Sequence, residues 1–203
     1  MAWLRLYTRS RRLPLAIVVS FGGAALIWAG WSLFSDAPDI STSLATFTVL
    51  LALAPLIPTL AGDDDSLEST AALRWPPRRA LHLLAAGVVV AVPMLASRAT
   101  GASFGSTGEM LRDVAGMTGL IGLSAALLGT RMAWQLPICW TVTQLIFGDP
   151  SSRGWPEALF WLVQPAGSEI ATVTALVLLT AGVATYAWRV GPRRAPAEAA
   201  LGQ

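Results

Sequence analysis

Long apolar stretches alternate with short polar ones along almost the whole chain. A stretch of about 20 mainly apolar residues is long enough to cross a bilayer as a helix. The stretch 110–147 is too long for one crossing, and because Gly129, Thr130 and Arg131 interrupt it, we expect two helices there. The predicted fold class is all-α, a polytopic membrane protein with six transmembrane helices in one domain, 1–203. The predicted spans are about 13–34, 44–61, 80–96, 110–129, 132–147 and 170–188.

Composition and charge support this interpretation and add an orientation. Hydrophobic residues make up 54% of the 203 positions and charged residues only 13%, which is unlike a soluble domain. All 14 basic residues are arginine, and the six-helix topology leaves only Arg98, Arg112 and Arg153 on one side. Because basic residues concentrate on the cytoplasmic side of membrane proteins, we expect both termini in the cytoplasm of a multi-pass protein of the cell membrane, with 189–203 as a cytoplasmic tail.

The polar segment 63–79 predicts a short amphipathic helix on the cytoplasmic face. Asp65 and Glu68 have the spacing of a helix N-terminal cap, and apolar side chains then recur every fourth residue until Pro76 and Pro77 are expected to end the helix. Two interpretations stay open, a solvated connector and a docking element for a cytoplasmic partner. Glu68 and Arg74 would then supply polar contacts to that partner. The candidate docking residues are Leu67, Glu68, Ala71, Arg74, Trp75 and Arg78.

The external loop 148–168 contains a second short helix. Pro156 suits the first turn of a helix, and the apolar run that follows ends before Pro165. Since this run is too short to cross a bilayer, we expect an interfacial or re-entrant helix, either a plain cap or a functional lid. Two tryptophans would anchor it at the interface, Trp155 and Trp161. The candidate residues of this element are Trp155, Pro156, Phe160 and Trp161.

Ionisable residues are scarce inside the predicted spans. Arg112 and Asp113 lie at the outer start of the fourth span, where we expect them to pair or to reach the headgroups, and His82 lies near the start of the third. Burying a charge in a bilayer costs at least about 2.5 kcal/mol, so a proton-relay transporter is hard to build from this chain. Polar candidates for a translocation path lie in the fifth span, although interhelical hydrogen bonds explain them equally well. They are Gln135, Thr141 and Gln144.

Recognisable catalytic motifs are missing from the sequence. A phosphate-binding loop of the GxxxxGK[ST] type requires lysine, and no HExxH pair or acidic metal cluster occurs. The single cysteine, Cys139, lies in an apolar run without a partner. We therefore expect no enzyme activity, no metal and no cofactor in this chain, and no nucleic-acid partner. The fourth span also carries glycine and alanine at three- and four-residue spacings, which predicts close helix packing.

Several loosely matching segments together resemble the permease subunit of an ABC transporter, of the small type-2 exporter-like kind found in actinobacteria. These segments are 5–12, 67–79, 128–134, 155–165 and 191–194. The resemblance implies that the helix at 67–75 couples to a cytoplasmic ABC-type ATPase, which would hold ATP and magnesium. It also implies a re-entrant element at 156–163 and assembly with a second copy or a homologous permease.

The working hypothesis is therefore a permease that exports a hydrophobic or amphipathic compound, driven by a separate ATPase. Two alternatives remain. The first is the substrate-capturing membrane subunit of a vitamin-uptake transporter, and the second is a membrane scaffold or sensor that transports nothing. Neither the cargo nor the direction of transport follows from the sequence.

Overall fold

The computed structural model describes residues 13–61 and 75–189, and within these ranges it is helical without any β-strand, which confirms the predicted all-α class. In chain order the α-helices are α2 (Leu13–Phe34), α3 (Thr42–Leu53), α5 (Trp75–Ala96), α6 (Thr107–Leu128), α7 (Gln135–Phe147), α8 (Trp155–Leu159) and α9 (Glu169–Arg189). Short 3-10 helices are η1 (Ala54–Leu60), η2 (Ser97–Ala99), η3 (Thr130–Met132) and η4 (Trp161–Val163).

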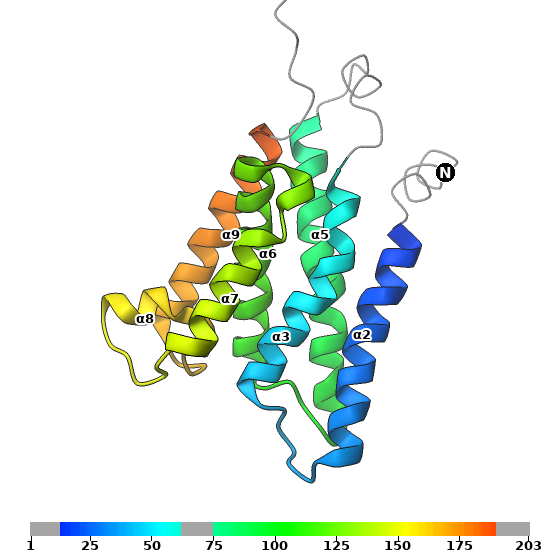
Figure 1. Ribbon diagram of the computed structural model, residues 1–203, viewed down its shortest axis with the longest axis vertical. Coiled ribbons are helices and arrows are strands. Elements are labelled where there is room, and N and C mark those ends of the chain that lie inside the picture. The colour runs from blue at the N-terminus through cyan, green and yellow to red at the C-terminus, as the bar shows by residue number, and fades with distance from the viewer. Residues whose placement is uncertain (1–12, 62–74, 190–203) are drawn as a thin grey trace, which may run out of the picture.

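The long helices run side by side and alternate in direction (Figure 1). Helix α2 begins, and α9 ends, at the same end of the bundle, where η1 also ends and α5 begins (Figure 1). We call this the arginine-rich end, because Arg78, Arg79, Arg131 and Arg189 belong to elements that start or finish there. The opposite end, which we call the loop end, carries the α2–α3 and α5–α6 connections and α8.

Five helical segments of the described chain are long and apolar enough to cross a membrane. The predicted fifth span differs, because η3 and a break precede α7, which has only 13 residues and is therefore about 20 Å long. A hydrocarbon core is about 30 Å thick, so α7 does not reach the length of a full crossing. The structure thus supports a membrane protein with five candidate spans, while the sixth stays a prediction.

Prolines explain two of the boundaries. Pro55 and Pro58 lie in η1, which continues α3 as a tighter helix because proline cannot donate the backbone hydrogen bond of an α-helix. Pro76 and Pro77 were expected to end a helix, and this was wrong, since they lie in the first turn of α5, where a missing N–H costs nothing. Helix α5 consequently begins at Trp75, before the predicted start of the third span at 80.

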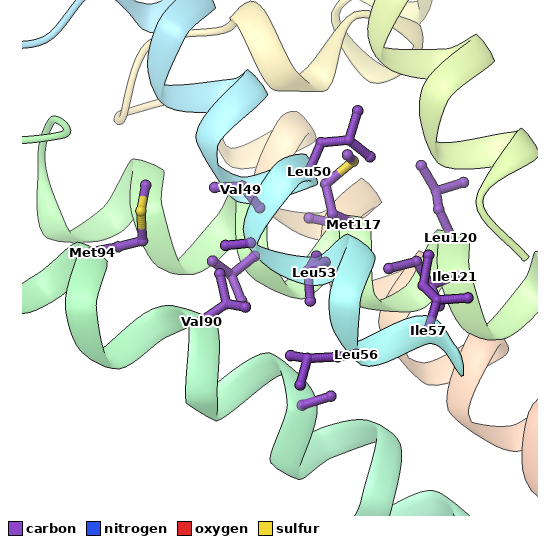
Figure 2. Packing of buried hydrophobic residues seen from close by; sticks show 14 of the residues in the cluster. Val49, Leu50, Leu53, Leu56, Ile57, Val90, Met94, Met117, Leu120 and Ile121 are labelled. Carbon is purple, nitrogen blue, oxygen red and sulfur yellow. The ribbon is translucent and has the colours of Figure 1, made fainter. Parts of the chain in front are cut away.

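The apolar core lies between α3, η1, α5 and α6 (Figure 2). Leu53 and Leu56 from the α3–η1 segment meet Val90 of α5 and Met117 of α6, and each of these side chains is at most 2% exposed. Helix α2 contributes little to this core, because its buried residues are only Ala16, Ser20 and Ala24. The bundle is therefore centred on α6, and α2 lies at its edge (Figure 1).

Glycines bring α6 and α9 into backbone contact. A Cβ atom on Gly119 would lie 2.3 Å from the carbonyl carbon of Leu178, and one on Gly182 would lie 2.1 Å from the carbonyl oxygen of Gly119. Gly122 would clash in the same way with the carbonyl group of Gly182, at 2.7 Å. No side chain fits at these positions, so the expected close packing of the fourth span is confirmed, with α9 as the partner.

Candidate functional site

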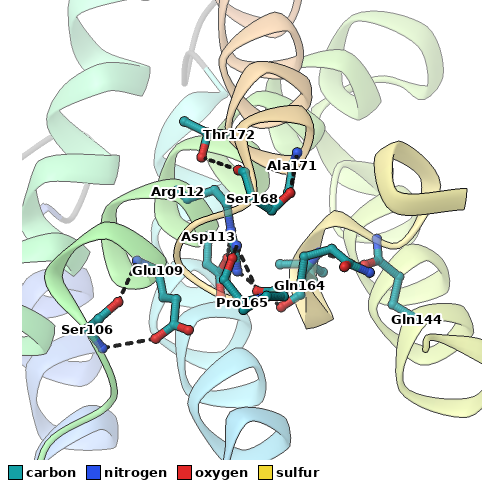
Figure 3. Close-up of polar contacts among 11 residues, drawn as sticks. Ser106, Glu109, Arg112, Asp113, Gln144, Gln164, Pro165, Ser168, Ala171 and Thr172 are labelled. Atoms are coloured by element: carbon teal, nitrogen blue, oxygen red, sulfur yellow. Dashed lines mark hydrogen bonds and ion pairs between the residues drawn. The ribbon is translucent and has the colours of Figure 1, made fainter. Parts of the chain in front are cut away.

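The first turns of α6 place three charged side chains on one face of the helix. Ser106 caps the helix, because its hydroxyl accepts a hydrogen bond from Glu109 N at 3.2 Å while Glu109 Oε2 accepts one from Ser106 N at 3.0 Å. Arg112 and Asp113 follow at three and four residues from Glu109, which is the spacing that aligns side chains along one helix face. Figure 3 shows these groups together at the loop end.

Arg112 links α6 to the chain that precedes α9. Its Nε donates to Asp113 Oδ1 at 2.9 Å, and its Nη1 donates to the carbonyl oxygens of Gln164 at 2.8 Å and Pro165 at 3.2 Å (Figure 3). Its Nη2 lies 3.5 Å from the carbonyl oxygen of Leu162. Since Arg112 and Asp113 are 5% and 7% exposed, this is a buried ion pair that also serves as a donor for irregular backbone.

The α8–η4 segment folds back against α6 and α9 instead of lying apart from them. Its helix is broken at Phe160, so α8 ends at Leu159 and η4 begins at Trp161. Trp161 is completely buried, and its ring occupies the space beside Gly116, where a Cβ atom would lie only 2.2 Å from it. The expected role of Trp161 as an interfacial anchor is therefore wrong, because the ring packs inside the protein, whereas Trp155 is 77% exposed, as an anchor would be.

Hydrogen bonds connect the α8–η4 segment and the residues after it to the neighbouring helices and loop. Gln144 of α7 accepts a hydrogen bond from Leu162 N through Oε1 at 2.8 Å, and Gln164 donates from Nε2 to the carbonyl oxygen of Asp149 at 3.0 Å. Ser168 accepts from Ala171 N at 3.0 Å and thus caps the start of α9, while its hydroxyl donates to Glu157 of α8. The segment is therefore tied to α6, α7 and α9.

The exposed loop before α8 is locally ordered by Asp149. Ser151 donates to Asp149 Oδ1 from its hydroxyl at 2.7 Å and from its backbone N–H at 2.8 Å. These hydrogen bonds favour the ionised carboxylate and hold the pKa of Asp149 below its ordinary value of 3.8, with the hydroxyl contributing most. The side chain thus stays charged at neutral pH.

A cavity of about 310 Å³ opens beside the charged face of α6 at the loop end. Its wall combines the charged groups Asp39, Glu109, Arg112 and Asp113 with apolar side chains from α3, α5 and the α5–α6 connection. A short parallel bridge between Asp39 and Ser103 holds the two connections together, with Ile40 N donating to the carbonyl oxygen of Ser103 at 2.8 Å. The cavity is of the size that small-molecule sites have, roughly 300–1,000 Å³.

Hydrogen bonds of buried side chains connect helices near the arginine-rich end. The Tyr186 hydroxyl of α9 donates to the carbonyl oxygen of Leu60 in η1 at 2.9 Å, and Tyr186 is completely buried. Thr59 Oγ1 lies 3.0 Å from His82 Nε2, and His82 is 9% exposed. The histidine is thus part of the helix packing.

The predicted docking residues fall mostly outside the described part of the chain. Leu67, Glu68, Ala71 and Arg74 lie in the segment 62–74, and their docking role stays a prediction. Trp75 and Arg78 belong to the first turn of α5, so at least these two positions are part of the third long helix and not of a separate coupling helix.

The predicted path residues on α7 are separated by the structure. Thr141 and Gln144 are at most 1% exposed and face α6 and η4, where the Thr141 hydroxyl lies 3.8 Å from Met117 Sδ. Gln135 is half-buried at the start of α7. The contacts of Thr141 and Gln144 are those of interhelical hydrogen-bonders, and their part in a translocation path stays a prediction.

One feature of the site was not predicted from the sequence. The pairing of Arg112 with Asp113 was expected, but its hydrogen bonds to the carbonyls of 162–165 were not, because they join residues about 50 positions apart. The signal available was the spacing of Glu109, Arg112 and Asp113 on one face of a predicted membrane helix, where charges point to function.

Comparison of the chain with protein-family models, with curated proteins and with solved structures finds no match.

Proposed function

We propose that the chain is a membrane-embedded permease subunit whose transport is driven by a separate cytoplasmic ABC-type ATPase. In this proposal it crosses the cell membrane six times, with η3 and the short helix α7 together in the fifth crossing, and both termini lie in the cytoplasm. The cargo is a hydrophobic or amphipathic compound. A second copy, or a homologous permease, completes the complex.

The observation that carries the proposal is the buried α8–η4 segment before the last long helix. Irregular backbone is tolerated at membrane depth only where protein or a water-filled cavity satisfies its polar groups. Here Arg112 supplies donors to the carbonyls of Gln164 and Pro165, and Trp161 fills the space beside Gly116. This is how a re-entrant element of a permease would be stabilised inside a bilayer.

The orientation of the bundle supports an input of force at the arginine-rich end. Arg78 and Arg79 of α5, Arg131 of η3 and Arg189 of α9 lie in elements that meet there, as the cytoplasmic side requires. A partner pressing on that end would act directly on α5, because this helix begins there. Since α5 packs against both α6 and α9, its movement would be passed on to them. Movement of α5 would thus reach the loop end and its cavity.

Purification of the tagged chain from its own host membranes in mild detergent tests the proposal. We expect an ATP-hydrolysing subunit to co-purify in fixed stoichiometry, and we expect the double substitution Glu68→Arg with Arg74→Glu to reduce its recovery at least tenfold. Arg153→Glu is the matched control, because Arg153 is exposed in the connection to α8 at the loop end.

The comparison between the double variant and the control decides the result. Loss of the ATPase from the double variant alone supports docking at 67–75. Recovery of the chain without any ATPase, or equal recovery from wild type and double variant, would contradict the proposal.

A further inference from the structure

We propose that the cavity at the loop end is a binding site for a small organic cation, an amine with an apolar body. Carboxylates on α6 and on the α2–α3 connection would hold the ammonium group, and the apolar part of the wall would hold the remainder. This site goes beyond the proposed permease function, because binding at the cavity needs neither an ATPase nor a second copy of the chain.

The charge of the cavity wall favours a cation. Asp39, Glu109 and Asp113 contribute three carboxylates, against one guanidinium from Arg112, so the formal charge of the wall is two negative charges. Asp113 is the deepest of these groups, since its side chain is only 9% exposed and it lies in the second turn of α6. Arg112 already pairs with Asp113, whereas Asp39 and Glu109 form no ion pair among the described residues, so a bound cation would offset their charge.

Each of the three carboxylates keeps one oxygen for a ligand. Asp113 uses Oδ1 for Arg112, Glu109 uses Oε2 for Ser106 N, and Asp39 uses Oδ1 for the Ser103 hydroxyl at 2.6 Å. The other oxygen of each group has no hydrogen-bond donor among residues 13–61 and 75–189.

Arg112 is poorly placed to make the cavity a site for anions. Its Nε donates to Asp113, and its Nη1 and Nη2 are directed at carbonyl oxygens of the segment 162–165. A guanidinium fixed in this way balances Asp113 and stabilises the backbone, so little of its donor capacity remains for a ligand.

The shape of the site argues for an organic cation and against a metal ion. Within the described ranges no three acidic, histidine or cysteine side chains come close enough to share a metal ion. The cavity of about 310 Å³ instead has room for a body of several carbon atoms. Apolar side chains make up much of the wall, namely Ile40, Val49, Met94, Phe104 and Met110.

Access is from the loop end. Asp39 and Thr42 at the rim are exposed, whereas Val49 and Met94 are at most 2% exposed and lie deeper. An amine entering from outside would therefore meet Asp39 first and reach Glu109 and Asp113 afterwards. In the proposed orientation this is the external side of the membrane.

Calorimetric titration of the full chain in lipid nanodiscs with three probes of similar size tests the site. The probes are 2-phenylethylammonium, the neutral 2-phenylethanol and the anionic 3-phenylpropanoate, and empty nanodiscs supply the correction for partition into lipid. We expect saturable binding of the ammonium probe alone. Glu109→Gln and Asp113→Asn should each weaken it roughly ten- to a hundredfold, as for loss of a charged hydrogen bond.

Controls separate binding from folding. Glu109→Gln keeps an oxygen for Ser106 N, so the helix cap persists and the thermal unfolding midpoint should not move. Asp36→Asn, an exposed carboxylate in the same connection as Asp39 but not part of the wall, should leave the affinity unchanged. Binding of the alcohol or the anion as tightly as the amine, no saturable binding of the amine, or an affinity that is indifferent to Glu109→Gln would each overturn the proposal. Because no nucleotide is present, these results are independent of the ATPase.

Discussion

Helices α2 and α6 have the same length, 22 residues, yet they occupy opposite situations in the bundle. In the most apolar window of α6, 67% of the residues are buried inside the protein, against 17% in α2. Both helices carry glycines, but only in α6 would a Cβ atom on some of them lie within 3 Å of a neighbouring atom. Helix α6 also carries charged residues and a polar cap, whereas no charged residue lies in α2. In a bilayer, lipid is as good a solvent for leucine as the protein interior is, so small and polar residues mark the side that faces protein.

Removal of the Arg112 side chain should produce the largest effect on α6. Arg112→Met leaves Asp113 buried without its partner and the carbonyls of Gln164 and Pro165 without a donor. We expect the free energy of unfolding to fall by about 3–5 kcal/mol, as for other broken buried ion pairs. Equilibrium unfolding in mixed micelles measures this loss.

The matched control is Arg98→Met. Arg98 is exposed and donates one hydrogen bond, to the carbonyl oxygen of Gly105 at 3.1 Å, so its removal should cost less than about 1 kcal/mol. Adding Asp113→Leu to Arg112→Met should restore part of the lost stability, because the unpaired charge disappears. Equal losses for the two arginine variants would mean that the ion pair does not stabilise α6.

A methyl group at the α6–α9 contact should have the second largest effect. Gly182→Ala places a Cβ atom 2.1 Å from the carbonyl oxygen of Gly119, and because backbone cannot move aside locally, we expect a loss of about 3 kcal/mol. Gly30→Ala in α2 meets nothing within 4 Å and should change the stability by less than about 0.5 kcal/mol. Thermal unfolding of both variants in the same detergent measures the difference, and similar midpoints would show that α9 can separate from α6 without loss.

A cavity in the core should have a smaller effect than a clash. Leu120→Ala removes a side chain that is 4% exposed, whereas Leu26→Ala removes one in α2 that is 75% exposed. Since lipid and protein interior are equally apolar, only the cavity contributes, and we expect a loss of about 2 kcal/mol for Leu120→Ala. Leu26→Ala should be neutral. Unfolding free energies from denaturant titration measure both, and a loss at Leu26 would indicate that α2 is covered by a partner.

Much of the helical framework could be predicted from the sequence, because bilayer thickness fixes how long an apolar stretch must be. Helix α2 ends at Phe34, where the first span was predicted to end, and α9 begins at Glu169, one residue before the predicted start of the sixth span. The boundaries that were missed depend on local chemistry: Pro76 and Pro77 begin a helix where they were expected to end one, and α6 starts at Thr107 because Ser106 and Glu109 cap it.

The site was harder to predict than the framework, because its contacts join distant parts of the chain. Nothing in the local pattern around Trp161 indicates that its ring packs on Gly116, and amphipathic tryptophans commonly lie at interfaces. Likewise, the cavity needs Asp39 from the α2–α3 connection and Glu109 from the start of α6, next to the connections that the Asp39–Ser103 bridge joins. Side-chain spacing predicts a shared helix face, whereas the approach of separate elements requires the packed structure.

The cap of α6 should contribute the smallest of these effects, and it has a close control in α3. Ser106→Ala removes the acceptor of Glu109 N, so we expect a loss of about 1 kcal/mol, which is typical of a side-chain N-cap. Ser41 holds the same position before α3 but forms no such hydrogen bond with its side chain, so Ser41→Ala should be neutral. Unfolding free energies from the same titration compare the two. Equal changes in the two variants would mean that the cap does not stabilise α6. The enclosed position of the helix would then depend on its packing and charges alone, and its polar start would serve the cavity beside it rather than the stability of the bundle.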